Sequence, residues 1–266
     1  MLAVAKPSEE HAVPPAGDGV TVARKGHLRR FRKALLLLTR PSWRRAARAG
    51  VAAAVEHRRV PFGAGFETII DVGAHHGQFS LLARALYPGA HLVCVEPLPE
   101  AVRRLRVLHA ADERVTILPF AAAGVASHRL LHVSQKTDSS SLLPILGAYV
   151  DAFPGTEEAR TIEVEARTLD ALLNPRVRRP ALLKIDAQGG ELDVLAGAAA
   201  LLDQVDAAFV ECSFVEFYRG QALADEIIGE FLRYGLRLYG VYSLVRDDRN
   251  RCLQADLLFQ RTGEDP

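Results

Sequence analysis

Short apolar runs alternate with segments of helical periodicity along most of the chain. The runs predict buried strands, and they occur at 69–70, 91–95, 115–118, 181–185, 207–210, 236–241 and 255–259. Between them, apolar side chains recur at helical spacing in segments 78–86, 99–109, 191–202 and 222–234. Strands that alternate with helices in this way are typical of an α/β domain built on a parallel sheet.

The middle of the chain departs from this alternation. Residues Arg129–Ser134 alternate between polar and apolar side chains like an edge strand, and Glu163–Arg167 predicts another short strand. Thr168 then precedes the first turn of a short helix as its cap. The segment Tyr149–Arg160 has no clear periodicity, so we expect it to form a mobile flap.

The first 62 residues differ in composition from the rest. Residues 1–22 are rich in Pro, Gly, Ala and Glu and predict a disordered tail. Residues 23–62 predict a basic helical extension with helices at Leu28–Leu38 and Trp43–His57, in which Glu56 stands alone among many arginines and lysines. Such a surface would suit an anionic substrate or a membrane, although a solvated helical face is the simpler explanation. Residues 63–266 then form the main domain.

Composition and charge restrict the classes of function. A chain of 266 residues, 49% hydrophobic and 24% charged, is long enough for one α/β domain with an appendage. The formal charge is +1, from 33 basic and 32 acidic residues, so no global field indicates a nucleic-acid partner. The three cysteines lack C-x-x-C spacing and predict free thiols. Without a signal-peptide core or a membrane-spanning run, we expect a soluble, cytoplasmic protein.

The stretch Thr68–Ser80, TIIDVGAHHGQFS, has the order strand, glycine turn, helix. This arrangement brings backbone N–H groups and a helix N-terminus to a ligand at the carboxyl edge of a parallel sheet. Gly73 can adopt a turn conformation closed to other residues, and Gly77 lets the helix begin close to the strand. Such turns also join strands to helices for packing reasons alone, so a second signal is needed.

The second signal is an acid at the end of the next strand. Glu96 ends the apolar run of HLVCVEP and lies 96 − 71 = 25 residues after Asp71. A carboxylate roughly 20 residues past the glycine turn can accept hydrogen bonds from both ribose hydroxyls of a bound nucleoside. Two further strands end in carboxylates, at Asp186 and Glu211, on what should be the same edge. This convergence predicts a ligand site there.

With these motifs in place, the sequence resembles the FkbM-type methyltransferases. The resemblance rests on DVGAHHGQFS (71–80), VEP (95–97), DSSSLLP (138–144), TLD (168–170), KIDAQGGELDVLAGA (184–198), VECSF (210–214) and QADLLF (254–259). It implies an S-adenosylmethionine-dependent enzyme of class I. The implied fold is Rossmann-like α/β, with seven mostly parallel strands, an antiparallel last strand and helices on both faces. Family members mostly methylate hydroxyl groups of sugars in polysaccharides and glycolipids, or of polyketide-type natural products.

The resemblance also implies where S-adenosyl-L-methionine would bind. Asp71 would lie near its ammonium group, Glu96 would hold the ribose, and the backbone of Ala121 would border the adenine. His75 stands where the family usually has Asn; either side chain can hydrogen-bond to the cofactor, but His75 adds a titratable group. The full set of cofactor-binding candidates is Asp71, Gly73, His75, Gly77, Glu96, Pro97, Ala121 and Ala122.

For an alcohol acceptor, a general base helps to remove the hydroxyl proton. Asp186 is the first candidate for the base or for a group that orients the acceptor, because the end of its strand faces the methyl donor; Glu211 and His75 come next. Asp186 could instead be a structural carboxylate that holds the turn after it, and Lys184 should share its face and pair with it. Asp186 and Glu211 could also bind a divalent metal, but no third ligand can be named, so we predict no metal.

Other classes of function fit less of the sequence. An NAD-dependent oxidoreductase would share the turn and the ribose acid but would normally show G-x-G-x-x-G, whereas His75 occupies the middle glycine position. A nucleic-acid base methyltransferase would need an aromatic residue beside Asp186, and the segment DAQG has none. A non-catalytic cofactor-binding scaffold remains an alternative. We therefore predict an O-methyltransferase for a small-molecule or glycan hydroxyl, with no nucleic-acid partner; the oligomeric state stays open.

Overall fold

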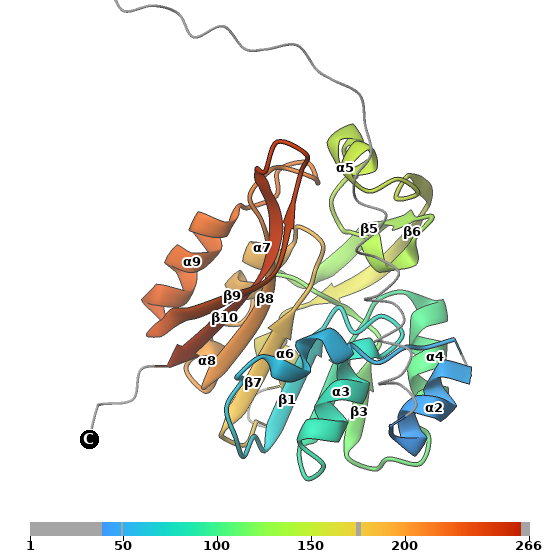
Figure 1. The fold of residues 1–266 in the computed structure, drawn as a ribbon, viewed down its shortest axis with the longest axis vertical. Helices are drawn as coiled ribbons and strands as arrows, with labels where there is room; N and C mark the ends of the chain where they lie inside the picture. The colour runs from blue at the N-terminus through green and yellow to red at the C-terminus, as the bar shows by residue number, and fades with distance from the viewer. Residues whose placement is uncertain (1–38, 49, 174–176, 262–266) are drawn as a thin grey trace, which may run out of the picture.

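The computed structural model describes residues 39–48, 50–173 and 177–261 of the chain. Its centre is a seven-stranded sheet in the order β3-β2-β1-β7-β8-β10-β9 (Figure 1). The strands are β1 (Thr68–Val72), β2 (His91–Val95), β3 (Val115–Leu118), β7 (Ala181–Ile185), β8 (Ala207–Ser213), β9 (Leu236–Arg246) and β10 (Cys252–Arg261). Strand β10 lies antiparallel between β8 and β9, and the pairs from β3 to β8 are parallel. The predicted Rossmann-like α/β fold is confirmed.

Helices cover both faces of the sheet because successive strand residues point to opposite sides. On β1, the neighbours Ile69 and Ile70 belong to different apolar clusters. The cluster of Ile69 includes α3 (Gln78–Leu86) together with Phe62 and Phe66. The cluster of Ile70 includes residues of α6 (Leu169–Leu173), α7 (Glu191–Ala196), α8 (Ala199–Leu202) and α9 (Ala224–Arg233). The core therefore consists of two apolar layers with the sheet between them.

A smaller three-stranded sheet has the order β4-β6-β5. It consists of β4 (Ala121–Ala122), β5 (Ser127–Ser134) and β6 (Glu158–Arg167), and α4 (Pro99–Leu108) packs beside it through Leu98 and Ala101. Strand β5 is an edge strand, as its alternation predicts. Strand β6 begins at Glu158 rather than at the predicted Glu163.

The predicted flap at Tyr149–Arg160 is wrong. The segment contains most of α5 (Gly147–Ala152) and the first residues of β6. Tyr149 is only 5% exposed and belongs to a cluster with Phe217 and Tyr218. Aromatic packing against a distant part of the chain orders this segment, and such packing leaves no helical or strand periodicity in the sequence.

The predicted helix Glu191–Leu202 is wrong as one element, because the chain forms two helices, α7 and α8, with Gly197 between them. A Cβ on Gly197 would lie 2.2 Å from the carbonyl oxygen of Ala123. The close backbone contact therefore requires glycine and interrupts the helix there.

The predicted helix Trp43–His57 is also wrong in extent. Helix α2 (Pro41–Arg48) ends early, and the 3₁₀ helix η1 (Val55–Arg59) follows. Between them the backbone N–H of Ala54 donates to the carbonyl oxygen of Gln78 at 2.9 Å, so this stretch docks on α3 instead of continuing the helix. The predicted tail 1–22 and helix Leu28–Leu38 lie outside the described residues.

Two further expectations concern cysteines and membranes. All three cysteines are free, and Cys94 and Cys212 are buried. In the part of the chain that the structure describes, no helix has the length and apolar character needed to cross a membrane.

Candidate functional site

A cavity of about 870 Å³ opens at the carboxyl ends of the central strands. Strand β1 lies between β2 and β7, so the chain order of the sheet reverses there, and open α/β sheets bind ligands at such a point. The walls come from the turn after β1, the ends of β2, β7 and β8, the loop 137–143, and two flanking segments, η1 and the β9–β10 pair. The volume lies within the roughly 300–1,000 Å³ of small-molecule sites.

The two glycines of the turn serve different contacts. Gly73 has a φ of +71°, and a Cβ there would lie 1.9 Å from the carbonyl oxygen of Asp186. The turn therefore rests directly on the end of β7. Gly77 has a φ of +93°, and a Cβ there would lie 2.6 Å from Cδ2 of Leu108. Gly73 is among the cavity-lining residues, whereas Gly77 packs against α4 behind the wall.

Glu96 follows β2 and lines the cavity. Its Oε1 accepts the backbone N–H of Leu98 and its Oε2 accepts that of His75, each at 2.8 Å. Burial raises the pKa of Glu96 to about 7. Each carboxylate oxygen can accept a second hydrogen bond, so the side chain is fixed by the backbone and still offers acceptor positions to a ligand. Pro97, Ala121 and Ala122 also line the cavity.

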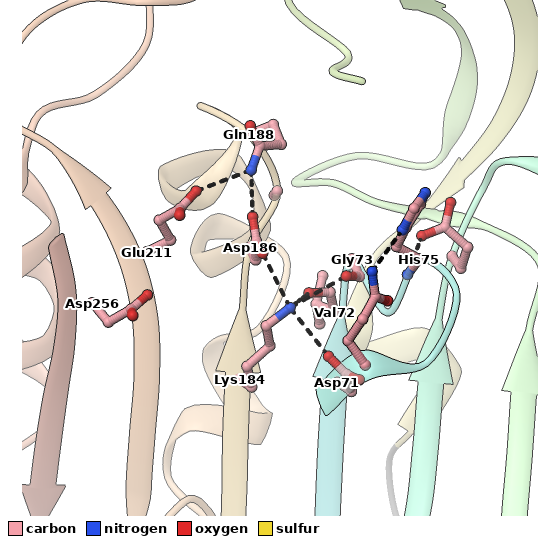
Figure 2. Close-up of polar contacts among 12 residues, drawn as sticks. Asp71, Val72, Gly73, His75, Lys184, Asp186, Gln188, Glu211 and Asp256 are labelled. Carbon is pink, nitrogen blue, oxygen red and sulfur yellow. Dashed lines mark hydrogen bonds and ion pairs between the residues drawn. The ribbon is translucent and has the colours of Figure 1, made fainter. Parts of the chain in front are cut away.

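Asp71 lies beneath the turn rather than in the cavity wall. It is 2% exposed, and its Oδ1 is 3.2 Å from Nζ of Lys184, its register partner on β7. The same ammonium group lies 3.4 Å from Oδ2 of Asp186, so the predicted Lys184–Asp186 pairing is confirmed (Figure 2). Burial alone would lower the pKa of Lys184, but the Asp71 and Asp186 carboxylates raise it. Lys184 is therefore a buried cation between two acids.

The side-chain amide of Gln188 connects several polar side chains of the site through hydrogen bonds, and the sequence analysis did not single it out. Its amide nitrogen donates to Oδ1 of Asp186 at 2.6 Å and to Oε2 of Glu211 at 3.0 Å (Figure 2). Its amide oxygen accepts a hydrogen bond from the Tyr218 hydroxyl at 2.6 Å. The amide thus lies between the two carboxylates that were considered as metal ligands. Among the described residues, no group of three or more His, Cys, Asp or Glu side chains could hold a metal ion.

His75 ties the glycine turn to the loop over the cavity. Its Nδ1 accepts a hydrogen bond from the Gln78 amide at 3.2 Å, so Nε2 carries the ring proton of the neutral imidazole and donates to Oγ1 of Thr137 at 2.9 Å. Burial lowers the pKa of His75 to about 4. The backbone φ of +44° is left-handed, a conformation that suits the Asn usual at this position. Both ring nitrogens are thus engaged by protein partners.

Acidic side chains follow one another across four strands. Figure 2 shows Asp256, Glu211, Asp186 and Asp71 in this order over β10, β8, β7 and β1. Glu211 and Asp256 are register partners, and Oε2 of Glu211 also accepts a hydrogen bond from Gln254 at 2.8 Å. Burial, together with the charge of Asp186, raises the pKa of Glu211 well above its ordinary value, and burial raises that of Asp256.

Sequence reasoning did not single out several residues that line the cavity, among them His57, Thr137, Gln188 and Asp256. Gln188 and Asp256 lie inside the motifs KIDAQGG and QADLLF, so the motifs themselves contained the signal. His57 lies in a basic segment whose composition is typical of a solvated helix, and it gives no such signal.

The chain is similar in sequence to methyltransferases. A family model described as "Methyltransferase FkbM domain" matches residues 71–238. The 2-O-methyltransferase NoeI of Sinorhizobium fredii is 26% identical to the chain in an alignment of 181 residues that covers 62% of this chain and 74% of that protein.

Similar solved structures include a precorrin-6y C5,15-methyltransferase from Geobacter metallireducens, with 11% identity and a TM-score of 0.41 over 74% of this chain and 81% of that one. Aeropyrum pernix fibrillarin with natively bound S-adenosyl-L-methionine is 12% identical, with a TM-score of 0.42 over 78% of this chain and 72% of that one. Likeness at this level does not assign a function, so the assignment of the chain rests on the family match.

Proposed function

Because the chain belongs to the methyltransferase FkbM domain family, we propose that it transfers the methyl group of S-adenosyl-L-methionine to a hydroxyl group of a sugar, glycoconjugate or natural product. Methyl transfer from this cofactor follows from the family match over residues 71–238. Transfer to an oxygen atom is more specific than the family match itself, and the name of NoeI, a 2-O-methyltransferase, supports it.

The observation that carries the proposal is the fixed carboxylate of Glu96 beside the glycine turn in one cavity. Two backbone N–H groups hold its oxygens at 2.8 Å, and each oxygen retains one acceptor position. Two acceptor positions match the two hydroxyls of a ribose. We assign Glu96 to the ribose, Gly73 and the His75 backbone to the methionine part, and Ala121–Ala122 to the adenine. Asp71, which pairs with Lys184 behind the wall, would act on the cofactor only through that pair.

The cofactor supplies an activated methyl group on a sulfonium, so the protein must chiefly orient the acceptor oxygen and exclude water. We call the part of the cavity over β7, β8 and β10, away from Glu96, the acceptor end. There, Gln188 holds the Asp186 carboxylate at 2.6 Å, and Lys184 lies on its other oxygen at 3.4 Å. This fixed carboxylate is suited to accept a hydrogen bond from the acceptor hydroxyl and so to orient it.

The charges at the acceptor end support a neutral polyol rather than an anionic acceptor. The cavity-lining acids there are Glu56, Asp186, Glu211 and Asp256. Lys184 lies between Asp71 and Asp186, and Arg129 contacts Oδ2 of Asp193 at 2.6 Å, so both cations are already paired. Acidic side chains form hydrogen bonds with hydroxyl groups, and these two paired cations offer little attraction to a phosphate. The basic N-terminal segment therefore bears less on the acceptor than these acids do.

Calorimetric titration with S-adenosyl-L-methionine tests the cofactor assignment. Replacement of Glu96 by Ala removes two hydrogen bonds to a charged group, each worth roughly 1.5–3 kcal/mol, so affinity should fall about 10²- to 10⁴-fold. Glu96→Gln keeps one carbonyl acceptor and guards against a folding defect, since Glu96 also holds two backbone N–H groups. Glu163→Ala is the matched control, because Glu163 is an exposed strand carboxylate with 68% of its side chain accessible.

NAD serves as the ligand control in the same titration. Wild-type affinity in Glu96→Ala would refute the ribose assignment, and binding of NAD in place of S-adenosyl-L-methionine would favour an oxidoreductase. Methyl transfer from labelled cofactor to a panel of methyl glycosides and secondary alcohols then tests the acceptor class. Cofactor binding without turnover on any of them would favour a non-catalytic scaffold.

A further inference from the structure

The far wall of the acceptor end contains a histidine–carboxylate pair made by segments outside the family match. His57 belongs to η1 and Asp256 to β10, whereas the match covers residues 71–238. Both side chains line the cavity. Nδ1 of His57 lies 3.5 Å from Oδ2 of Asp256, an ion-pair distance that is long for a hydrogen bond. The two residues are 199 positions apart in sequence, so the fold alone brings them together.

Three observations show that His57 is fixed in place. Its imidazole packs edge-on against the ring of Phe209, with centroids 5.2 Å apart. Its own backbone is anchored upstream, where Ala54 donates to the carbonyl oxygen of Gln78. Val55, the first residue of η1, is 3% exposed and packs in a cluster with Leu82 of α3. A catalytic side chain requires such a rigid support.

The other base candidates in the cavity already have protein partners. Both ring nitrogens of His75 have protein partners, and Glu211 accepts hydrogen bonds from Gln188 and Gln254 on one oxygen. Asp186 faces Gln188 through one oxygen and Lys184 through the other. In His57, Nδ1 faces Asp256, which leaves Nε2 as the nitrogen that can face an acceptor.

We propose that His57 is the general base for the acceptor hydroxyl and that Asp256 holds its ring in the Nδ1-protonated tautomer; this rests on the proposed O-methyl transfer. The acceptor oxygen gives its proton to Nε2 while its electron pair forms the bond to the methyl carbon. The electron pair of the broken carbon–sulfur bond stays on the sulfur of the demethylated donor. The resulting imidazolium lies beside the Asp256 carboxylate, and Asp186 orients the hydroxyl.

The electrostatic surroundings agree with this role. Burial lowers the pKa of His57, and the charges of Asp256, Glu56 and Asp186 oppose that effect while Lys184 adds to it. The ring is therefore neutral at neutral pH and able to accept a proton, and the acids around it stabilise the cation that forms. Phe209 and Asp256 cover the ring from β8 and β10, and Glu56 adjoins it on η1.

Ring-nitrogen NMR tests the inference before any acceptor is known. Spectra of the full-length protein with S-adenosyl-L-homocysteine are recorded across pH, and the His57→Asn variant identifies the His57 signals among those of nine histidines. We expect a neutral ring at pH 7.5 with the proton on Nδ1, and loss of that preference in Asp256→Asn. A cationic ring at pH 7.5, or a proton on Nε2, would overturn the proposal.

Turnover gives the second readout, with labelled S-adenosyl-L-methionine and the same methyl glycosides and secondary alcohols as probes. His57→Asn should lower kcat by on the order of 10²-fold or more and abolish the acidic limb of the pH profile, while cofactor affinity stays within about twofold of wild type. His128→Asn is the matched control, because His128 forms an exposed pair with Glu163 at 2.9 Å outside the cavity wall. Unchanged kcat and pH profile in His57→Asn would refute the base. Absence of cofactor binding by the wild type would instead refute the proposed function.

Discussion

Replacement of Gly73 by Ala tests whether the glycine turn must rest on the end of β7. Gly73 has a φ of +71°, and an added Cβ would lie 1.9 Å from the carbonyl oxygen of Asp186. Gly65 provides a matched control, because its φ is +73° and an added Cβ would meet no atom within 4 Å. The two substitutions therefore impose the same backbone cost and differ in the steric overlap.

The expected magnitudes follow from these two terms. A left-handed alanine costs roughly 1–2 kcal/mol relative to glycine, which is the whole expected effect of Gly65→Ala. Gly73→Ala adds the overlap with a backbone oxygen that cannot rotate away, and overpacking of a buried contact costs about 1–3 kcal/mol. We therefore expect Gly73→Ala to be less stable than wild type by about 2–5 kcal/mol. Relief of the overlap would also displace Asp186, so cofactor affinity should fall in this variant and not in the control.

Urea-induced unfolding of wild type and both variants measures the stability terms, and calorimetric titration with S-adenosyl-L-methionine measures affinity. Equal destabilisation of the two variants would refute the close approach of the turn to β7. Full cofactor affinity in a folded Gly73→Ala protein would refute the link between that approach and the binding site.

Two further predictions concern buried charges near the cavity. Burial raises the pKa of Glu191 from its ordinary 4.5 to about 7. Because the folded state binds this proton more tightly than the unfolded state, the contribution of Glu191 to folding stability is complete below pH 4.5 and is lost as pH rises through 7. Glu191→Gln keeps the oxygen that accepts the Ala187 and Gly189 N–H groups. In urea unfolding, we expect this variant to be about as stable as wild type at pH 4.5 and more stable by up to about 3 kcal/mol at pH 8. The same stability difference at both pH values would contradict the titration of Glu191. Lys184→Met should destabilise the protein by roughly 3–5 kcal/mol because it leaves buried carboxylates unpaired. The double variant Lys184→Met/Asp71→Asn should recover part of this loss in the same assay. If the costs of the two substitutions simply added, the ion pair would be refuted.

Much of the fold is encoded locally and could be predicted from the sequence. The strand Val115–Leu118 was predicted with its observed bounds, and Thr168 caps α6 through its hydroxyl, which accepts the backbone N–H of Ala171 at 3.2 Å. These features depend on residues within a few positions of one another. The wrong predictions concern features that depend on residues far apart in the sequence. Gly197 interrupts a helix because of Ala123, and Tyr149 orders the predicted flap through contacts with residues near position 217.

The candidate site divides in the same way. Gly73 and Glu96 come from one continuous strand–turn–helix–strand unit, so their spacing in sequence already indicates that they share a ligand. The contact of Gln188 with Tyr218 depends on a left-handed backbone at φ +51° and on a partner 30 positions away, and neither leaves a pattern in the sequence. Lys184 was predicted to pair with Asp186, but its shorter contact, with Asp71, depends on the register of two parallel strands.

The two ends of the cavity therefore differ in how the sequence specifies them. The cavity residues that we assign to the cofactor lie within residues 71–122, inside the segment that matches the family. The acceptor end draws on η1 before the match and on β9 and β10 after it, through residues such as His57, Ser243 and Asp256. The acceptor end thus depends on residues of η1 and β9 that neither the matched segment nor the motifs contain, whereas its Asp256 belongs to the motif QADLLF. Substitutions in η1 or β10 should thus alter the choice and activation of the acceptor while cofactor affinity is retained.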